Sequence, residues 1–132
     1  MRVMYPIALF CLIVGSSASS SFAQQDVKII DKKFLAVGAA LVVSSVYDVE
    51  TTKLCVNAKL CREASPIMAP FINSSRPAAY GYLAGLNSGS LYFAYHLKGH
   101  KNPRIRRLWW VVPISQIVGH SLVGSFNLRF VL

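Results

Sequence analysis

The feature that most constrains this chain is an apolar run, Ala78–Leu97, that contains no Lys, Arg, Asp or Glu. As a helix with a rise of 1.5 Å per residue, a run of this length reaches about 30 Å, the thickness of the hydrocarbon core of a bilayer. Two further runs, Phe34–Tyr47 and Leu108–Phe126, also lack these four residue types. No segment alternates with the period of two that a membrane barrel needs. The sequence therefore predicts an all-α fold, a small integral-membrane bundle of about three transmembrane helices at residues 34–49, 78–97 and 108–128.

Composition and charge favour the same class of protein. Hydrophobic residues make up 54% of the chain and charged residues only 14%, whereas soluble domains carry roughly 25% charged residues. The basic segment Lys98–Arg107 holds five of the positive residues and no acid, and Trp109 and Trp110 follow directly. Tryptophans beside a basic block are typical of the boundary between lipid and water. We therefore expect the net charge of +9 to serve contact with anionic lipid headgroups, and we expect no nucleic-acid partner.

Residues 1–23 have the three parts of a secretory signal peptide. Arg2 supplies a positive start, Ile7–Val14 is a short apolar core, and Ser21-Phe22-Ala23 offers small residues where signal peptidase cleaves. The core is shorter than the roughly 20 residues of a membrane span. The alternative is an uncleaved first helix. With a cleaved signal, residues 24–132 form a single helical membrane domain.

The signal peptide and the positive charges predict opposite topologies. A cleaved signal places segments 24–33 and 98–107 outside, and leaves Cys55 and Cys61 in the reducing cytoplasm as thiols. Positive residues prefer the cytoplasmic side, and these two segments hold eight Lys and Arg residues against five on the opposite side. If the charges decide, Cys55 and Cys61 face an oxidising compartment and are candidates for a disulfide. Both topologies stay open on sequence alone.

Glycines at a spacing of four mark a face for close helix contact. Gly81, Gly85 and Gly89 form a doubled GxxxG within the uncharged run. This pattern lets another backbone approach closely where lipid supplies no hydrophobic drive. The partner is a helix of this chain, a second copy in a homo-oligomer, or another membrane protein.

A second row of small residues leads to an acid. Ala36, Ala40 and Ser44 repeat every four residues in the first run, and Asp48 continues the row. We expect this face to pack against other helices, because an ionisable group near a membrane is least costly on a packed side.

Asp48 shares a helix face with Thr51, Thr52 and Cys55 if the first helix continues past Tyr47. One interpretation is an acid at the membrane boundary that is solvated or capped by the nearby hydroxyls. The other is a polar site that faces the interior of the bundle, since intramembrane acids are functional by default.

Helix geometry selects a partner for Asp48. His120 lies about 18 Å along the third run from Leu108, roughly the depth of Asp48 counted from Phe34. We therefore predict an Asp48–His120 contact, with Asn87 or Gln116 nearby. The alternative is that His120 bonds a backbone carbonyl or another helix.

The segment Val46–Met68 resembles a group of uncharacterised small bacterial helical membrane proteins. That group has an Asp-x-x-Thr pattern at the end of one helix and a Glu-x-Asn-Pro turn before the next part. The matching residues here are Asp48, Thr51, Glu63, Ser65 and Pro66. Ser65 stands where the pattern has Asn, so a role for an amide there does not carry over. The resemblance brings no assigned activity with it.

Enzyme signatures are absent from the sequence. It contains no phosphate-binding loop, no HExxH and no GxSxG, and the spacing of Cys55 and Cys61 does not match a CxxC metal or redox motif. We therefore expect no catalytic residues, metal or cofactor. The sequence favours a non-enzymatic multi-pass protein of a bacterial inner membrane that acts by helix–helix association. The alternative is a small transport or proton-relay subunit that uses Asp48 and His120.

Overall fold

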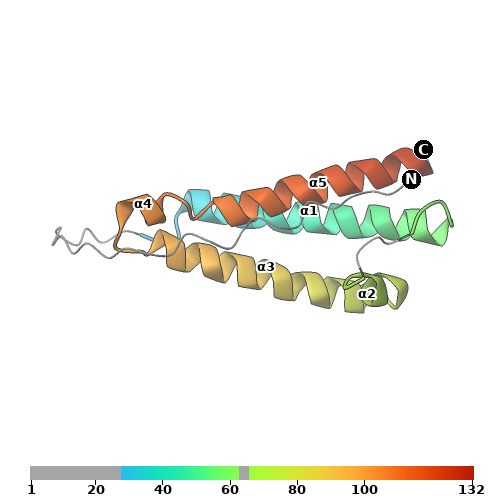
Figure 1. Cartoon of the computed structure of the whole chain (residues 1–132), viewed down its shortest axis with the longest axis horizontal. Coiled ribbons are helices and arrows are strands. Elements are labelled where there is room, and N and C mark those ends of the chain that lie inside the picture. Colours follow the sequence, from blue (N-terminus) through green and yellow to red (C-terminus); the bar gives the residue numbers. More distant parts are fainter. Residues whose placement is uncertain (1–27, 63–65) are drawn as a thin grey trace.

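The computed structural model describes residues 28–62 and 66–132, and all regular structure within these ranges is helical. The elements are α1 (Lys32–Asn57), α2 (Ala69–Asn73), α3 (Arg76–Lys98), α4 (Pro103–Arg106) and α5 (Val111–Val131). The three long helices lie side by side in an elongated bundle, in which α1 and α5 run in one direction and α3 runs in the other (Figure 1). The two short helices lie at opposite ends, which we call the α2 end and the α4 end (Figure 1). The all-α prediction is confirmed.

Local sequence explains where α1 and α3 begin. The Asp31 carboxylate accepts a hydrogen bond from the Phe34 amide at 2.8 Å, and the Ser75 hydroxyl accepts one from the Ala78 amide at 3.4 Å. Both residues are N-caps, which satisfy amides that no helical carbonyl can reach. Pro77 lies in the first turn of α3, where its missing N–H costs nothing.

α1 is longer than the predicted span of residues 34–49. It continues to Asn57, just before Lys59 adopts a left-handed conformation with φ 58°. Burial holds its last turns in place, because Val49 and Cys55 are 1% and 0% exposed. Val49 packs in one cluster with residues of α2 and α3, namely Ile72, Ala79 and Leu83. Tertiary packing therefore keeps a polar stretch of sequence helical.

The other predicted spans correspond to α3 and α5. α3 contains residues 78–97 entirely. α5 begins at Val111 instead of Leu108, because residues 107–110 form the turn that links α4 to α5. Residues 1–23, Glu63 and Ser65 lie outside the described residues, so the signal peptide and this part of the loop pattern stay predictions.

Buried positions recur every seven residues along the bundle. In α1 this row is 9%, 0%, 8% and 0% exposed at Phe34, Leu41, Asp48 and Cys55. In α5 the same repeat joins Pro113, His120 and Asn127, of which His120 is half-buried. A seven-residue repeat keeps one face of each helix against its neighbours along the whole bundle.

The small-residue row predicted for α1 is packed only at one end. Ser44 and Asp48 are buried, but Ala36 and Ala40 are exposed. A spacing of four turns about 40° past a full helical turn at each step. The small residues at a spacing of four therefore turn away from the packed face of α1. The buried residues at a spacing of seven occupy that face instead.

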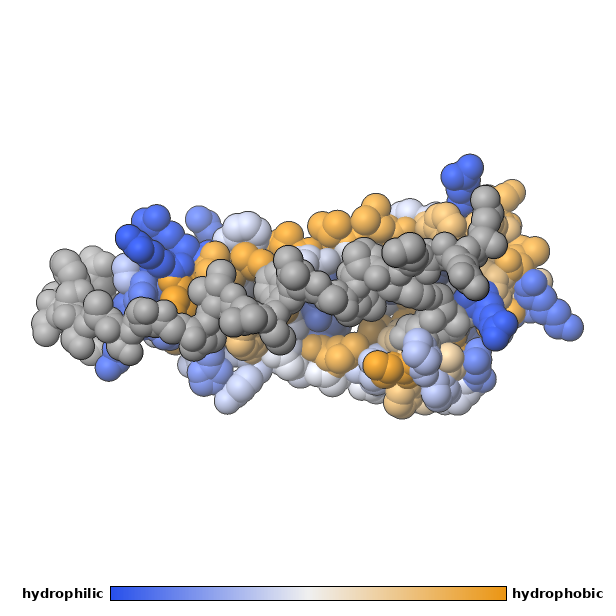
Figure 2. All heavy atoms as spheres, viewed as in Figure 1, coloured by the Kyte–Doolittle hydropathy of each residue, from blue (hydrophilic) through white to orange (hydrophobic). Residues whose placement is uncertain are grey.

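Many polar side chains lie in the interior of the bundle, and many large apolar side chains lie on its surface. The buried polar and charged side chains include Ser45, Asp48, Lys53, Asn87 and Lys98, while large apolar side chains such as Val43 (68% exposed), Tyr92 (67%) and Leu122 (66%) face outward. In one view, hydrophilic residues gather at the two ends of the bundle and hydrophobic residues lie along α5 between them (Figure 2). Large apolar side chains therefore make up much of the outer surface, while polar side chains lie in the interior.

Among the described residues, one helix is long and apolar enough to cross a membrane, namely α1. It lies near the N-terminus, and 39% of its most apolar window is buried inside the bundle. α3 and α5 carry more Gly, Ser, Asn, Gln and His residues along their lengths. Spans at α3 and α5 stay predictions.

Candidate functional site

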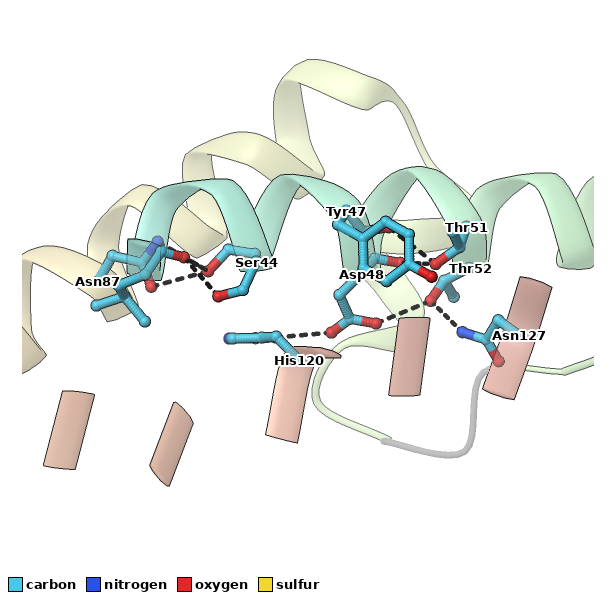
Figure 3. Close-up of polar contacts among 10 residues, drawn as sticks. Ser44, Tyr47, Asp48, Thr51, Thr52, Asn87, His120 and Asn127 are labelled. Carbon is cyan, nitrogen blue, oxygen red and sulfur yellow. Dashed lines mark hydrogen bonds and ion pairs between the residues drawn. The ribbon is translucent and has the colours of Figure 1, made fainter. Parts of the chain in front are cut away.

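Asp48 of α1 and His120 of α5 meet inside the bundle. His120 Nδ1 lies 2.7 Å from Asp48 Oδ2, and the two side chains are only 18% and 11% exposed. The contact that helix geometry predicts is therefore present (Figure 3). A protonated imidazole at this distance gives a charge-assisted hydrogen bond, and a neutral ring with its proton on Nδ1 gives an ordinary one. In both states the ring satisfies a carboxylate that has little access to water.

The polar contacts continue from this pair toward the α2 end (Figure 3). Thr52 Oγ1 donates to Asp48 Oδ1 at 3.3 Å, and Asn127 Nδ2 of α5 donates to Thr52 Oγ1 at 2.7 Å. Thr51 instead donates to its own helix, with Oγ1 2.8 Å from the Tyr47 carbonyl oxygen. Of the two threonines predicted beside Asp48, Thr52 therefore supports the carboxylate and Thr51 does not.

Asn87 of α3 joins α1 one helical turn away from Asp48. Its Nδ2 donates to Ser45 Oγ at 3.1 Å, and Ser45 also donates to the Leu41 carbonyl at 2.7 Å. Asn87 therefore pairs with Ser45 and not with Asp48. We call the interior row that these contacts form the polar seam; its members are Ser45, Asp48, Thr52, Asn87, His120 and Asn127.

Gln116 does not join the polar seam through its carbonyl. Gln116 Oε1 and Ser90 Oγ are buried and have no hydrogen-bond partner within the described part of the chain. A buried polar atom without a partner costs free energy unless a water or another group satisfies it. These two atoms, one on α3 and one on α5, are therefore less well satisfied than the polar seam.

A glycine permits the close contact of α1 with α5. A Cβ atom at Gly124 would lie 2.6 Å from the ring carbons of Tyr47 and 3.2 Å from Thr51 Oγ1. The same tyrosine reaches α5 through its hydroxyl, 3.4 Å from Ser125 Oγ. A side chain at position 124 would require the Tyr47 ring to move.

Ion pairs tie α3 to α1 at both ends of the bundle. At the α4 end, Lys98 Nζ donates to Asp31 Oδ1 at 2.5 Å. At the α2 end, the Arg76 guanidinium contacts Glu50 at 3.1 Å, and the Tyr80 hydroxyl donates to the same carboxylate at 2.5 Å. These contacts hold α3 in register while the polar seam occupies the middle of the bundle.

Lys98 also sets the ionisation of Asp31. Its hydrogen bond holds the pKa of the Asp31 carboxyl below the ordinary value of 3.8, and the Phe34 amide lowers this pKa further. The lysine itself is enclosed by aromatic rings, with Nζ 5.5 Å from the Phe34 ring centroid and 4.6 Å from that of Trp109. The α4 end therefore contains one neutralised ion pair over an aromatic floor.

The two cysteines predicted as disulfide candidates are bonded to each other. Their Cα atoms lie 5.4 Å apart, within the usual range for a disulfide. Cys55 is buried in α1, and Cys61 is half-buried beyond the end of that helix. Which compartment the α2 end faces stays a prediction. Pro66 lies in the exposed turn before α2.

The glycine face predicted on α3 points away from its own chain. Gly81, Gly85 and Gly89 are all exposed, and within residues 28–62 and 66–132 a Cβ atom at any of them would meet nothing within 4 Å. The three glycines therefore play no part in packing α3 against α1 or α5.

Three members of the site escaped sequence reasoning, namely Ser45, Gly124 and Asn127. Asn127 follows His120 by seven residues and Gly124 follows it by four, so both lie on the face of α5 that carries His120. Ser45 precedes Asp48 by three residues in the same way. A search for polar and small residues on the faces of Asp48 and His120 finds all three.

Comparison of the chain with protein-family models, with curated proteins and with solved structures finds no match. The function of the site is therefore argued from its geometry alone.

Proposed function

We propose that this chain is a multi-pass protein of a bacterial inner membrane that acts by helix–helix association and not by catalysis. Its partner is a second copy, bound through the exposed glycine face of α3. The observation that carries the proposal is the open space over Gly81, Gly85 and Gly89, where a Cβ atom would meet no described residue within 4 Å.

The inside-out polarity supports placement in a bilayer. A bundle that buries Asp48, Asn87 and Lys98 while exposing Val43 and Leu122 matches a surrounding solvent that is apolar. In lipid, buried polar groups hold helices together, and outward apolar side chains carry no penalty.

The glycine face supports association because lipid supplies no hydrophobic drive between helices. Close van der Waals contact of backbones replaces that drive, and it requires residues without side chains. At the α1–α5 interface, Gly124 instead leaves room for the side chain of Tyr47. A flat uncharged face also suits a symmetric pair of identical chains, since it offers the same surface to both.

Energy transfer between labelled copies in lipid vesicles tests this proposal. Gly85→Leu should abolish the transfer, because its side chain separates the two backbones. Ala84→Leu is the matched control, since Ala84 is exposed on α3 and lies about 100° around the helix from Gly85. Equal transfer in the parent and in Gly85→Leu would contradict the proposal, as would equal loss in both variants.

The Asp48–His120 pair favours a second candidate function, a proton-relay or transport subunit. A carboxylate and an imidazole lie 2.7 Å apart inside the bundle, and ionisable residues at membrane depth often mark proton paths. Proton flux into vesicles that contain the full chain tests this alternative. Flux that Asp48→Asn abolishes would support it, and an Asp48→Asn variant indistinguishable from the parent would contradict it.

A further inference from the structure

The α4 end carries an open hollow of about 450 Å³ that neither candidate function uses. Its lining is three basic residues and both tryptophans, namely Lys98, Arg106, Arg107, Trp109 and Trp110. We propose that this hollow binds the phosphodiester headgroup of an anionic phospholipid. The inference rests on the proposed placement of the chain in a bilayer and goes beyond it, because it assigns a defined headgroup site instead of general attraction to a charged surface.

The charges in the hollow are unevenly balanced. Lys98 is neutralised by Asp31 at 2.5 Å. Arg106 and Arg107 have no carboxylate partner within the described residues, and segment 98–107 contains no acid at all. Two guanidinium groups are therefore free to bind an anion, and their planar forks match phosphate oxygens.

The same hollow disfavours a zwitterionic choline headgroup. A quaternary ammonium would seek an aromatic face or a free carboxylate. The face of Trp109 is already covered by Lys98 Nζ, 4.6 Å from the ring centroid, and Asp31 is already paired. The Trp109 face and the Asp31 carboxylate are therefore both occupied by the protein itself, and Trp110 is the one ring of the lining left for a quaternary ammonium.

The aromatic floor of the hollow suits a lipid better than it suits a free ion. Trp109 packs against Phe34 at 5.6 Å between ring centroids, while Trp110 and Leu108 are 47% and 53% exposed beside it. Tryptophan rings prefer the level of the headgroups. An exposed apolar side chain next to them offers a surface for the acyl chains, which inorganic phosphate lacks.

Tryptophan fluorescence reports this site directly, because the chain contains only two tryptophans and both line the hollow. The full chain is reconstituted in lipid nanodiscs with increasing amounts of brominated phosphatidylglycerol or of brominated phosphatidylcholine. We expect the brominated anionic lipid to reach half of its quenching at a mole fraction about tenfold lower.

Variants distinguish binding of the headgroup in the hollow from general attraction to positive charge. Arg106→Gln with Arg107→Gln should bring the two lipids to equal quenching, and the exposed single change Arg107→Gln should move half-quenching part of the way. The control pair Lys59→Gln with Arg129→Gln removes the same charge at the α2 end and should leave the preference intact. Unchanged quenching by brominated phosphatidylcholine in each variant shows that the chain is still inserted.

Four results would overturn the inference. They are equal half-quenching by both lipids in the parent, an equal loss of preference in the control pair, an unchanged preference in the Arg106→Gln, Arg107→Gln variant, and a saturable change in emission with inorganic phosphate in lipid-free detergent. Absence of quenching by either brominated lipid would overturn the placement in a bilayer and the headgroup site with it. Failure of the Gly85→Leu test, by contrast, would remove the self-association proposal and leave the headgroup site standing.

Discussion

The α1–α5 interface and the outer face of α3 both carry glycines that fit close helix contact, yet only the first is closed within the chain. Gly124 lies so near Tyr47 that an added Cβ would come within 2.6 Å of the ring, whereas Gly81, Gly85 and Gly89 face open space. Gly124 lies beside polar groups that contact each other across the α1–α5 interface. The three glycines of α3 have no such contacts beside them among the described residues. The difference teaches that a regular spacing of small residues identifies a helix face that another helix can approach closely. Polar residues on that face decide whether the approaching helix belongs to the same chain.

The largest expected effect comes from removing the histidine of the polar seam. His120→Ala leaves the mostly buried Asp48 carboxylate with only Thr52 as a side-chain donor among the described residues. Loss of one member of a buried pair costs about 3 kcal/mol of unfolding free energy. Unfolding of the detergent-solubilised chain measures this loss, with the exposed His96→Ala as control.

A double-mutant cycle refines that prediction. Asp48→Asn and His120→Ala should each destabilise the chain, and together they should cost less than the sum of the two. A coupling free energy near zero would show that the Asp48–His120 contact itself adds no stability. The contrast between the α1–α5 interface and the outer face of α3 would then depend on packing alone.

Gly124→Ala should have the next largest effect. The added methyl requires the Tyr47 ring to move, and overpacking of this kind costs about 2 kcal/mol. Gly85→Ala is the matched change on the outer face, where the new Cβ meets nothing, and it should not destabilise the monomer. Equal destabilisation by Gly124→Ala and Gly85→Ala would contradict the expected difference between the α1–α5 interface and the outer face of α3.

Asn127→Ala should have a smaller effect than either. It removes the 2.7 Å hydrogen bond to Thr52 Oγ1, and hydrogen bonds between membrane helices average about 0.6 kcal/mol. Asn87→Ala removes the bond to Ser45 between α1 and α3 and should cost a similar amount. Unfolding in the same detergent measures both, and a loss confined to Asn87→Ala would show that α3 is held more tightly than α5.

The smallest effect concerns pH at the α4 end. The pKa of Asp31 is lowered in the folded chain, so its ion pair with Lys98 stabilises fully above the ordinary value of 3.8 and loses this contribution as the pH falls through the lowered value. Asp31→Asn keeps a good N-cap and removes the charge.

The stability difference between the parent and Asp31→Asn should therefore shrink as the pH falls below 3.8. Unfolding midpoints measured across that range test the sign. A difference that grows toward acid pH would show that another group controls this end of the bundle.

Much of the site was open to sequence reasoning because it depends on distances along helices. The Asp48–His120 contact follows from the helical rise and from the starts of two apolar runs, and it is present at 2.7 Å. Asn127 lies on the same face as His120 and was accessible by the same argument. The expected place of Gln116 beside Asp48 was less successful, since its carbonyl oxygen has no partner in the described residues.

Contacts between the ends of helices were beyond such reasoning. Lys98 and Asp31 are separated by 67 residues, and Arg76 and Glu50 by 26. Their pairing depends on how α3 is shifted along α1, and a shift of one turn moves a side chain by about 5.4 Å. Nothing in the spacing of these residues specifies that shift.

The sequence by itself determined the helices and the polar face of α1, because caps, uncharged runs and residue spacing act within a single helix. The tertiary structure alone decided that α1 runs to Asn57, that Ala36 and Ala40 are exposed, and which glycine is enclosed. These outcomes depend on the side chain that lies across an interface. The Tyr47 ring occupies the space beside Gly124, whereas no described residue occupies the space beside Gly85, and this difference is set only when the helices come together.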